Sequence, residues 1–481
     1  MRRALPIVAL ATLALFATAA KKRKPEGAPR PAATPGVEIA ANDGARVVRV
    51  TLPGPLFGYA LPRESGGRVP YLLAGDGDAH RLFRLDLRHG TIDLVRGDLG
   101  SDAIGLGSRG GERESALLVG APGRLAVLGT AGISTLVREP ALGDPQLPPR
   151  LDGDAADRLC LVTLGALDCV PLAPKLDPVR LPLPVEVERQ KTGLSASTPE
   201  ARYLGEGDDG PLYAAGPEAH ERRLRVWLLA PGASPERRVR ECWALLPGDE
   251  EVDDAEVLLV GSTPTLVVTS RPAKKLGIFS KKFLRVFSLQ ADPTRAGVKP
   301  VLATQSDLHL WQSPVVRAFD ADGDGIADLA IGWWKGLTST EAEVDVYRGD
   351  GKGGFEAKPR DSVVKVPDAS RGWLELADVN GDGVPDLLYS RGEHIVEARL
   401  GARTKKGNDL FADKAWRSSP PIANVGGRAF VSVGAGEQRR VIPLLPHRAR
   451  LDDLDGDGHP EVILVGATNG QGVFAVVRFT P

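Results

Sequence analysis

Short aliphatic runs, most of them bounded by Gly, Pro or Asp, recur along the whole chain. Aliphatic runs of about four to eight residues between turn residues are typical of buried β-strands. Many are followed by a second apolar stretch, and no long stretch has the period of an amphipathic helix. Eight of the runs share one pattern: YLLAG (71–75), ALLVG (116–120), LCLVT (159–163), LYAAG (212–216), VLLVG (257–261), LAIG (329–332), LLYS (387–390) and VILVG (462–466).

A series of small antiparallel sheets, repeated along the chain, is the architecture of a β-propeller. Residues 41–481 give about 55 residues per unit for eight blades and about 63 for seven. Both lengths suit a four-stranded blade with its loops. The sequence therefore predicts an all-β protein, a β-propeller with seven or eight blades of four-stranded antiparallel sheets. The unit count favours eight, and LYAAG is the unit that fits the pattern least well.

Strand signals also lie at the two ends of the repeated region. RVVRVTL occupies 46–52, and VFAVVRF occupies 473–479. Pairing the first strand with the last would complete the final blade and remove an exposed sheet edge. We therefore expect both strands in one blade, which would close the propeller.

Three loops of nine residues share the pattern D-x-[DN]-G-D-G-x-x-[DE], at 320–328, 378–386 and 453–461, and each leads into an aliphatic run. Carboxylates about 4 Å apart repel by roughly 1 kcal/mol per pair even in water. A bound hard cation would offset this repulsion, and Ca²⁺ collects about six to eight oxygen ligands. Two earlier acidic stretches, 151–157 and 249–256, lack one residue or both glycines, so we assign no cation to them.

The stretch FDADGDGIADLAIG at 319–332 resembles the FG-GAP/VCBS repeat of integrin α-chain propellers and of many secreted bacterial propellers. The stretch VYRGDGKGGFE at 346–356 is similar to the later hairpin of the same repeat. The resemblance is specific over about 310–481 and faint over 46–300. It implies a propeller in which each acidic loop joins two strands of a blade and binds Ca²⁺.

The resemblance also implies a ligand set for three calcium sites. Positions one, three, five and nine of each loop would supply side-chain oxygens, and position seven would supply its backbone carbonyl. The third site departs from the family pattern, because a glutamate replaces the usual final aspartate. The implied ligands are Asp320, Asp322, Asp324, Ile326 and Asp328; Asp378, Asn380, Asp382, Val384 and Asp386; and Asp453, Asp455, Asp457, His459 and Glu461.

The composition fits this picture and excludes one class of partner. The chain has 481 residues, a formal net charge of −1 and a pI of about 6.7. This balance gives no bulk positive field for binding nucleic acid. The 56 glycines and 39 prolines suit many short strands and turns better than long helices.

The amino terminus has the features of an export signal over residues 1–20. Arg2 and Arg3 precede a short apolar stretch, and small residues follow it. Residues 21–40 form a basic, Pro/Ala-rich linker, so the propeller is expected over 41–481. The protein would be secreted, periplasmic or part of the cell envelope. The basic KKRK at 21–24 leaves a second option, an uncleaved signal that anchors the chain; no later stretch is apolar enough for a transmembrane domain.

The chain has three cysteines, Cys160, Cys169 and Cys242. A hairpin that turns at 164–165 would place Cys160 opposite Cys169. A disulfide and a pair of buried thiols are both compatible with this arrangement. Cys242 would have no cysteine partner.

No motif of a known catalytic centre is present: there is no H-E-x-x-H and no G-x-S-x-G. The only dense groups of functional side chains in the sequence are the three acidic loops, and their pattern suits cation ligation. We therefore expect a monomeric, non-catalytic binding, adhesion or scaffold module for a protein or glycan ligand. The alternative is an exported propeller enzyme that acts on polysaccharide at the central channel.

The tripeptide RGD, known as an adhesion signal, occurs at 96–98 and at 348–350. The second copy lies inside the Gly-rich hairpin of the repeat. We interpret both copies as turn chemistry.

Overall fold

The computed structural model of the chain divides into two units, Met1–Thr34 and Pro35–Pro481. The predicted signal peptide and residues 21–33 of the predicted linker lie outside the described residues. The structure describes residues 34–64, 67–76, 79–100, 105–109, 116–121, 124–129, 132–138, 158–163, 165–171, 179–190, 193–197, 201–207, 210–220, 223–247, 250–272, 282–289, 300–306, 315–335, 341–365, 374–391, 395–402, 410–422, 430–433, 440–443, 450–468 and 471–480.

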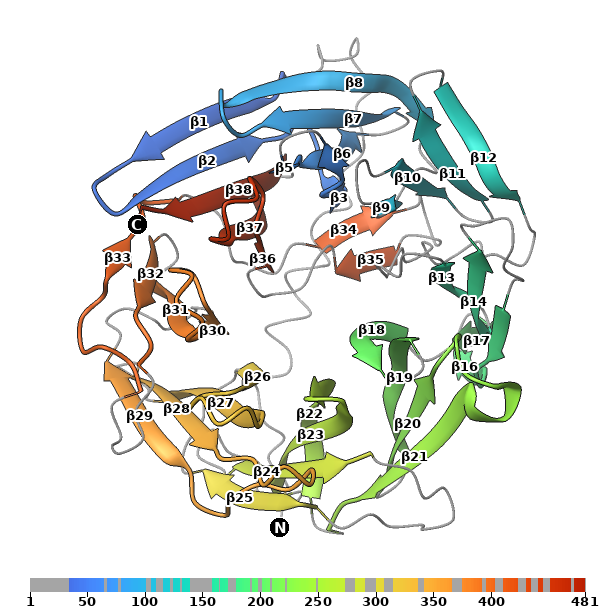
Figure 1. Cartoon of the computed structure of the whole chain (residues 1–481). Helices are drawn as coiled ribbons and strands as arrows, with labels where there is room; N and C mark the ends of the chain where they lie inside the picture. Colours follow the sequence, from blue (N-terminus) through green and yellow to red (C-terminus); the bar gives the residue numbers. More distant parts are fainter. Residues whose placement is uncertain are drawn as a thin grey trace, which may run out of the picture. The chain divides into compact units, whose positions relative to one another are not determined.

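The described part of the chain is built from β-strands, with one short 3₁₀ turn at Pro235–Arg237. Most strands form four-stranded antiparallel sheets whose order follows the sequence, as the labels in Figure 1 show. The first sheets are β3 (Leu56–Ala60), β6 (Tyr71–Asp76), β7 (Ala79–Asp86) and β8 (Thr91–Gly100); then β9 (Gly105–Arg109), β10 (Ala116–Ala121), β11 (Arg124–Gly129) and β12 (Gly132–Arg138); then the three strands β13 (Arg158–Thr163), β14 (Ala166–Pro171) and β15 (Val179–Pro182).

The middle and later sheets repeat this arrangement. They are β18 (Ala201–Gly207), β19 (Gly210–His220), β20 (Arg223–Leu229) and β21 (Val239–Leu245); β22 (Glu250–Val260), β23 (Thr263–Pro272), β24 (Lys282–Ser288) and β25 (Leu302–Ser306); β26 (Val315–Phe319), β27 (Asp328–Lys335), β28 (Glu341–Tyr347) and β29 (Arg360–Lys365); and β30 (Leu374–Ala377), β31 (Asp386–Arg391), β32 (Ile395–Arg399) and β33 (Arg417–Ser418). Three hairpins lie outside these sheets: β4 (Arg63–Glu64) with β5 (Gly67–Arg68), β16 (Glu186–Gln190) with β17 (Gly193–Ser197), and β34 (Phe430–Val433) with β35 (Arg440–Pro443).

The last sheet has five strands and contains both ends of the described chain. Its order is β1 (Gly36–Ala41), β2 (Ala45–Thr51), β38 (Gln471–Phe479), β37 (Glu461–Thr468) and β36 (Arg450–Asp452). Among the described residues, this makes eight sheets of three or more strands. Each of the eight aliphatic runs lies in a different one of these sheets, including LYAAG in β19. The predicted β-propeller fold is confirmed, and the sheet count agrees with eight units.

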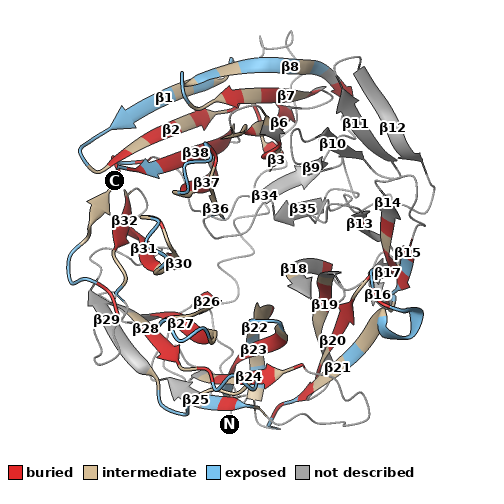
Figure 2. Cartoon of the chain, viewed as in Figure 1, coloured by how far each residue is buried: buried red, intermediate tan, exposed pale blue. Residues whose placement is uncertain are grey.

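The aliphatic runs are continuous because both faces of a blade are covered. In β23, Leu266 and Val268 pack with Leu224 of β20, whereas Val267 between them packs with Leu329 of β27. Neighbouring side chains on a strand point to opposite faces. A strand between two other sheets therefore buries every residue, and Figure 2 shows this as the red segments in the middle strands.

The predicted pairing of the terminal strands is confirmed. β2 pairs with β38 in antiparallel register from Ala45 opposite Phe479 to Thr51 opposite Val473. One face of this sheet packs on the β30–β33 sheet and the other on the sheet of β3 and β6–β8. Closure of the full set of blades into a ring stays a prediction.

The structure adds a strand that the sequence did not predict. β1 begins at Gly36, inside the segment that we assigned to the linker, and pairs with β2. Most of its residues are exposed, so the alternation of buried and polar positions that identifies a strand is weak there.

The pairing of the terminal strands should contribute measurably to stability. Val477 in β38 is 0% exposed and packs in the cluster between its own sheet and the β30–β33 sheet. Val477→Ala removes two buried methyl groups, so we expect the free energy of unfolding to fall by about 1–3 kcal/mol. Urea denaturation measures this, with the exposed Val95→Ala as control. Equal effects of the two substitutions would contradict the assigned packing.

Cys160 and Cys169 lie directly opposite each other in β13 and β14 and form a disulfide. The disulfide, one of the two arrangements compatible with the sequence, is the one found. Cys242 is a free, half-buried thiol in β21.

No helix in the described part of the chain is long and apolar enough to cross a membrane.

Candidate metal centres

Each acidic loop joins the first two strands of a blade. Residues 320–327 connect β26 to β27, residues 378–385 connect β30 to β31, and residues 453–460 connect β36 to β37. The ninth residue of each loop is the first residue of the following strand. The antiparallel pairing of the two strands therefore fixes both ends of the loop.

The first carboxylate organises the backbone of its loop. Asp320 accepts hydrogen bonds from the N–H groups of Gly323 at 2.7 Å and Gly325 at 3.0 Å. The two other loops repeat these bonds at the same positions. Asp378 accepts from Gly381 and Gly383, and Asp453 accepts from Gly456 and Gly458, all at 2.7–3.0 Å.

The two glycines of each loop are required by the backbone conformation. All six have positive φ, between +76° and +90°. Residues with a Cβ rarely adopt this region, whereas glycine enters it without steric cost. The G-D-G element of the pattern therefore creates the tight turn that brings the acids together.

The fifth and ninth positions also make the same contacts in all loops. The fifth carboxylate accepts from the N–H of the seventh residue, for example Asp324 from Ile326 at 2.8 Å. The ninth carboxylate accepts from the N–H of the second residue, for example Asp328 from Ala321 at 3.0 Å. The remaining bonds of these two kinds are Asp382 with Val384, Asp457 with His459, Asp386 with Val379, and Glu461 with Leu454, at 2.8–3.0 Å.

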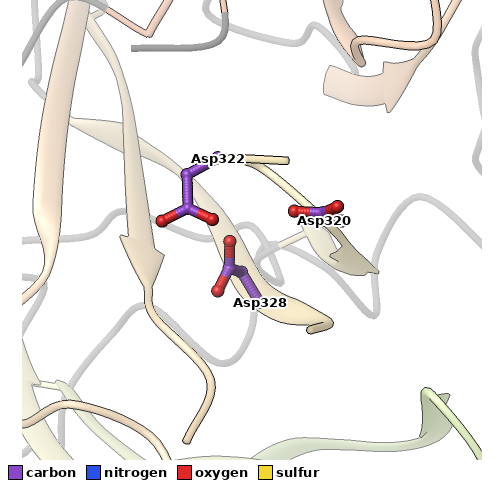
Figure 3. A group of neighbouring side chains, drawn as sticks. All are labelled: Asp320, Asp322 and Asp328. Carbon is purple, nitrogen blue, oxygen red and sulfur yellow. The ribbon is translucent and has the colours of Figure 1, made fainter. Parts of the chain in front are cut away.

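Two of the loops bring three carboxylates together. Oxygens of Asp320, Asp322 and Asp328 lie within 4.8 Å of one another, and so do those of Asp453, Asp455 and Glu461. Figure 3 shows the first trio, with the carboxylates of Asp322 and Asp328 turned toward each other. In the 378–386 loop the third position is Asn380, and no such trio is found among its described acids.

The ninth carboxylate is the most deeply placed in every loop. Asp328, Asp386 and Glu461 are all buried. Burial raises the pKa of Asp328, and the neighbouring Asp322 and Asp324 add to this rise. In the same way, burial raises the pKa of Asp386 to about 6 and that of Glu461 to about 7. The ninth position of each loop thus places a carboxyl group where water is largely excluded, and this disfavours its charged form.

Two arginines that we did not predict reach the acids from neighbouring strands. Arg348 follows β28 and contacts Asp322 at 3.1 Å and Asp324 at 2.8 Å. Arg478 in β38 contacts Asp455 and Asp457 in the same way. The Arg-Gly-Asp at 348–350 is therefore part of the hairpin that packs on the loop, because the N–H of Gly349 also donates to Asp328 at 2.8 Å.

Only a weak sequence signal marks these arginines. Each lies 20 or fewer residues beyond its loop, at or just after the end of a later strand, and strand pairing brings it close to the acids. The stretches VYRG and VVRF share an arginine after two apolar residues. This similarity becomes informative only once the register is known.

The two earlier acidic stretches do not form such loops in the described part of the chain. Residues 250–260 are strand β22, and Glu250 is paired with Arg285 and Ser270. Residues 151–157 lie outside the described residues.

The donor set of the three loops fits a hard cation. Every side chain at a ligating position carries oxygen donors, from carboxylates or from the amide of Asn380. His459 occupies position seven, where the expected donor is its backbone carbonyl. Hard divalent cations such as Ca²⁺ prefer this chemistry, whereas Zn²⁺ prefers nitrogen and sulfur.

Comparison with known protein families gives one match. Residues 320–389 match the FG-GAP-like repeat. This segment contains the first two acidic loops, so the resemblance is confirmed there. A search among curated protein sequences finds no match to this chain.

Two solved structures show a weak overall likeness. The Dos1 propeller has 14% sequence identity and a TM-score of 0.45, and the alignment covers 88% of this chain and 93% of that one. A post-proline cleaving enzyme from Rickettsia typhi has 8% identity and a TM-score of 0.31, covering 78% of this chain and 58% of that one. Likenesses this weak indicate nothing about function. The fold is assigned from the number, order and pairing of the sheets described above.

Proposed function

We propose that this protein is a calcium-stabilised β-propeller that acts as a non-catalytic binding module. The observation that carries the proposal is the threefold repetition of one loop geometry with oxygen donors. The same hydrogen bonds recur at positions one, five and nine in three blades. The match of residues 320–389 to the FG-GAP-like repeat supports calcium as the ion.

The proposed ligands are the fifteen residues at positions one, three, five, seven and nine of the loops. With four side chains and one carbonyl, each loop would provide most of the six to eight oxygens that Ca²⁺ takes. Mg²⁺ demands near-ideal octahedral geometry and retains several waters, which suits such loops less well.

The ion would act as a structural staple. Each loop connects two strands of a blade, and its ninth residue is buried against the sheet. An ion that binds only the folded state shifts the folding equilibrium toward that state. The loops would thus fix the connection between the first and second strands of three blades.

The proposed location is outside the cytoplasm, in the cell envelope or the medium. The apolar segment within residues 1–20, with its preceding arginines, supports export. Extracellular calcium modules bind with dissociation constants of about 10⁻⁴ to 10⁻³ M, which suits calcium-rich surroundings. The proposed ligand is a protein or a glycan.

Removing one central carboxylate tests the calcium sites. We expect Asp382→Ala to abolish binding at one of three sites, because this residue holds position five and also bonds Val384. Isothermal titration calorimetry at millimolar Ca²⁺ would then give two sites instead of three. Asp168→Ala is the control, since Asp168 pairs with Arg180 far from the loops in sequence. Absence of calcium binding by the unaltered protein would overturn the proposal.

A further inference from the structure

The same register position of two blades carries an arginine. In the blade of β26–β29, Leu329 pairs with Tyr347, so the next residues along, Asp328 and Arg348, lie opposite each other. In the last blade, Val462 pairs with Val477, which places Glu461 opposite Arg478. Both arginines therefore stand across from the ninth loop residue.

Each arginine contacts the same two loop positions. Arg348 lies 3.1 Å from Asp322 at position three and 2.8 Å from Asp324 at position five. Arg478 contacts the equivalent Asp455 and Asp457, and lies 3.8 Å from Glu461. These contacts use oxygens that the proposed calcium ion would also need.

The remaining blade differs at both members of this pair. Leu387 pairs with Arg399, so the residue opposite Asp386 is Leu400. Position three of this loop is Asn380 in place of aspartate. The aspartate at position three and the opposing arginine thus occur together in two blades and are absent together in the third.

This exchange keeps the formal charge of the three clusters equal when all their carboxylates are ionised. The 320–328 and 453–461 loops each combine four carboxylates with one guanidinium. The 378–386 loop has three carboxylates, and no arginine contacts its acids among the described residues. In the absence of an ion, the two arginines offset part of the carboxylate repulsion. The middle loop has one carboxylate fewer, and the amide of Asn380 donates to Asp382 at 2.9 Å.

The arginine must also oppose a bound divalent ion. A unit positive charge about 5 Å from a divalent cation weakens its binding roughly tenfold even at the dielectric of water. The guanidinium also occupies carboxylate oxygens that the ion would need. Both effects act in the same direction at the two loops. The third loop lacks the opposing guanidinium, and its Asp382 accepts a hydrogen bond from the neutral amide of Asn380 instead.

We propose that Arg348 and Arg478 are built-in counter-cations that lower the calcium affinity of their loops and hold these loops in shape without the ion. The 378–386 loop, with Asn380 and Leu400, has no such counter-cation among the described residues. This inference rests on the proposed binding of calcium.

The test uses the full-length protein and calcium titrations followed by calorimetry. Arg348→Leu gives the first loop the residue that the middle blade has at the same place. We expect one of the three sites to bind calcium tenfold or more tightly, while the melting temperature in EDTA falls. Installing an arginine opposite Asp386 in the middle blade, with Leu400→Arg, should weaken the middle site about tenfold.

Two further variants separate charge from folding. Arg348→Lys keeps the charge and should leave the affinity within about threefold of the unaltered protein. Arg271→Leu is the matched control, because Arg271 is similarly exposed and also touches two acids, Glu251 and Asp253, outside the loops. It should leave calcium affinity unchanged.

The outcomes distinguish this inference from the proposed function. Unchanged or weaker binding after Arg348→Leu would overturn the inference and leave calcium binding intact. In that case the arginines orient the carboxylates for the ion. Absence of calcium binding in every variant would overturn both.

Discussion

Removal of calcium should lower the thermal stability of the protein and loosen its carboxy-terminal blades selectively. At calcium concentrations ten times the dissociation constant, each ion stabilises the folded state by about 1.4 kcal/mol, and three ions by about 4 kcal/mol. All three loops lie between 320 and 461. The effect should therefore concentrate in residues 315–480 and be small in residues 56–260.

Hydrogen exchange with and without EDTA measures this distribution directly. Backbone N–H groups that donate to the first carboxylate, such as those of Gly381 and Gly383, should lose the most protection. Asp324→Ala and Asp382→Ala should each reproduce part of the fall in melting temperature. Addition of Mg²⁺ at the same concentration is the ionic-strength control and should restore little.

Equal changes in hydrogen-exchange protection in the two halves of the chain, or no change, would contradict local stabilisation of the three loops by calcium. A smaller loss of protection in the 320–328 loop of the unaltered protein than in the Arg348→Leu variant would in addition support the role that we infer for Arg348. The same experiment thus tests where calcium acts and what holds the loop without it.

The repeated fold could be predicted from the sequence because both faces of each blade are covered. Continuous runs such as VILVG at 462–466 result from this burial and are visible without knowledge of any partner strand. The pairing of 46–52 with 473–479 could also be predicted, since two isolated strand signals at the ends of a repeat array have few other partners. β1 was missed because its side chains are mostly exposed.

The backbone of the acidic loops could be predicted for a similar reason. Pattern and glycine spacing are local, and the hydrogen bonds of Asp378 to Gly381 and Gly383 stay within six residues. The arginines could not be predicted, because their contacts depend on the register between strands. A shift of one residue in that register would turn Arg478 to the other face of the sheet.

Acidity should change stability in opposite directions with and without calcium. In the metal-free protein, Asp386 has a pKa of about 6 and Glu461 a pKa of about 7, both raised mainly by burial, against 3.8 and 4.5 in the unfolded chain. Between these values the folded state binds more protons than the unfolded state. The free energy of unfolding therefore rises as pH falls from about 7.5 to 5, and this gain is lost again as pH rises through the folded-state pKa values.

Calcium reverses the sign, because the ion requires the same carboxylates in their charged form. With saturating Ca²⁺, protons compete with the ion, and the free energy of unfolding should fall as pH falls through the same window. A shift of one pKa unit corresponds to about 1.4 kcal/mol, so the two carboxylates together should produce a change of about 2 kcal/mol or more.

Urea unfolding at pH 7.5, 6.5 and 5.5, in EDTA and in calcium, measures both slopes. Glu461→Gln removes one titrating group and should reduce the acid-induced gain in EDTA. Glu251→Gln serves as the control, because Glu251 pairs with Arg271 outside the loops. Parallel slopes in EDTA and in calcium would show that the buried carboxylates and the ion do not share a site. Opposite slopes in EDTA and in calcium that become parallel in the double variant Glu461→Gln, Asp386→Asn would show that the ion binds at the ninth position of the loops.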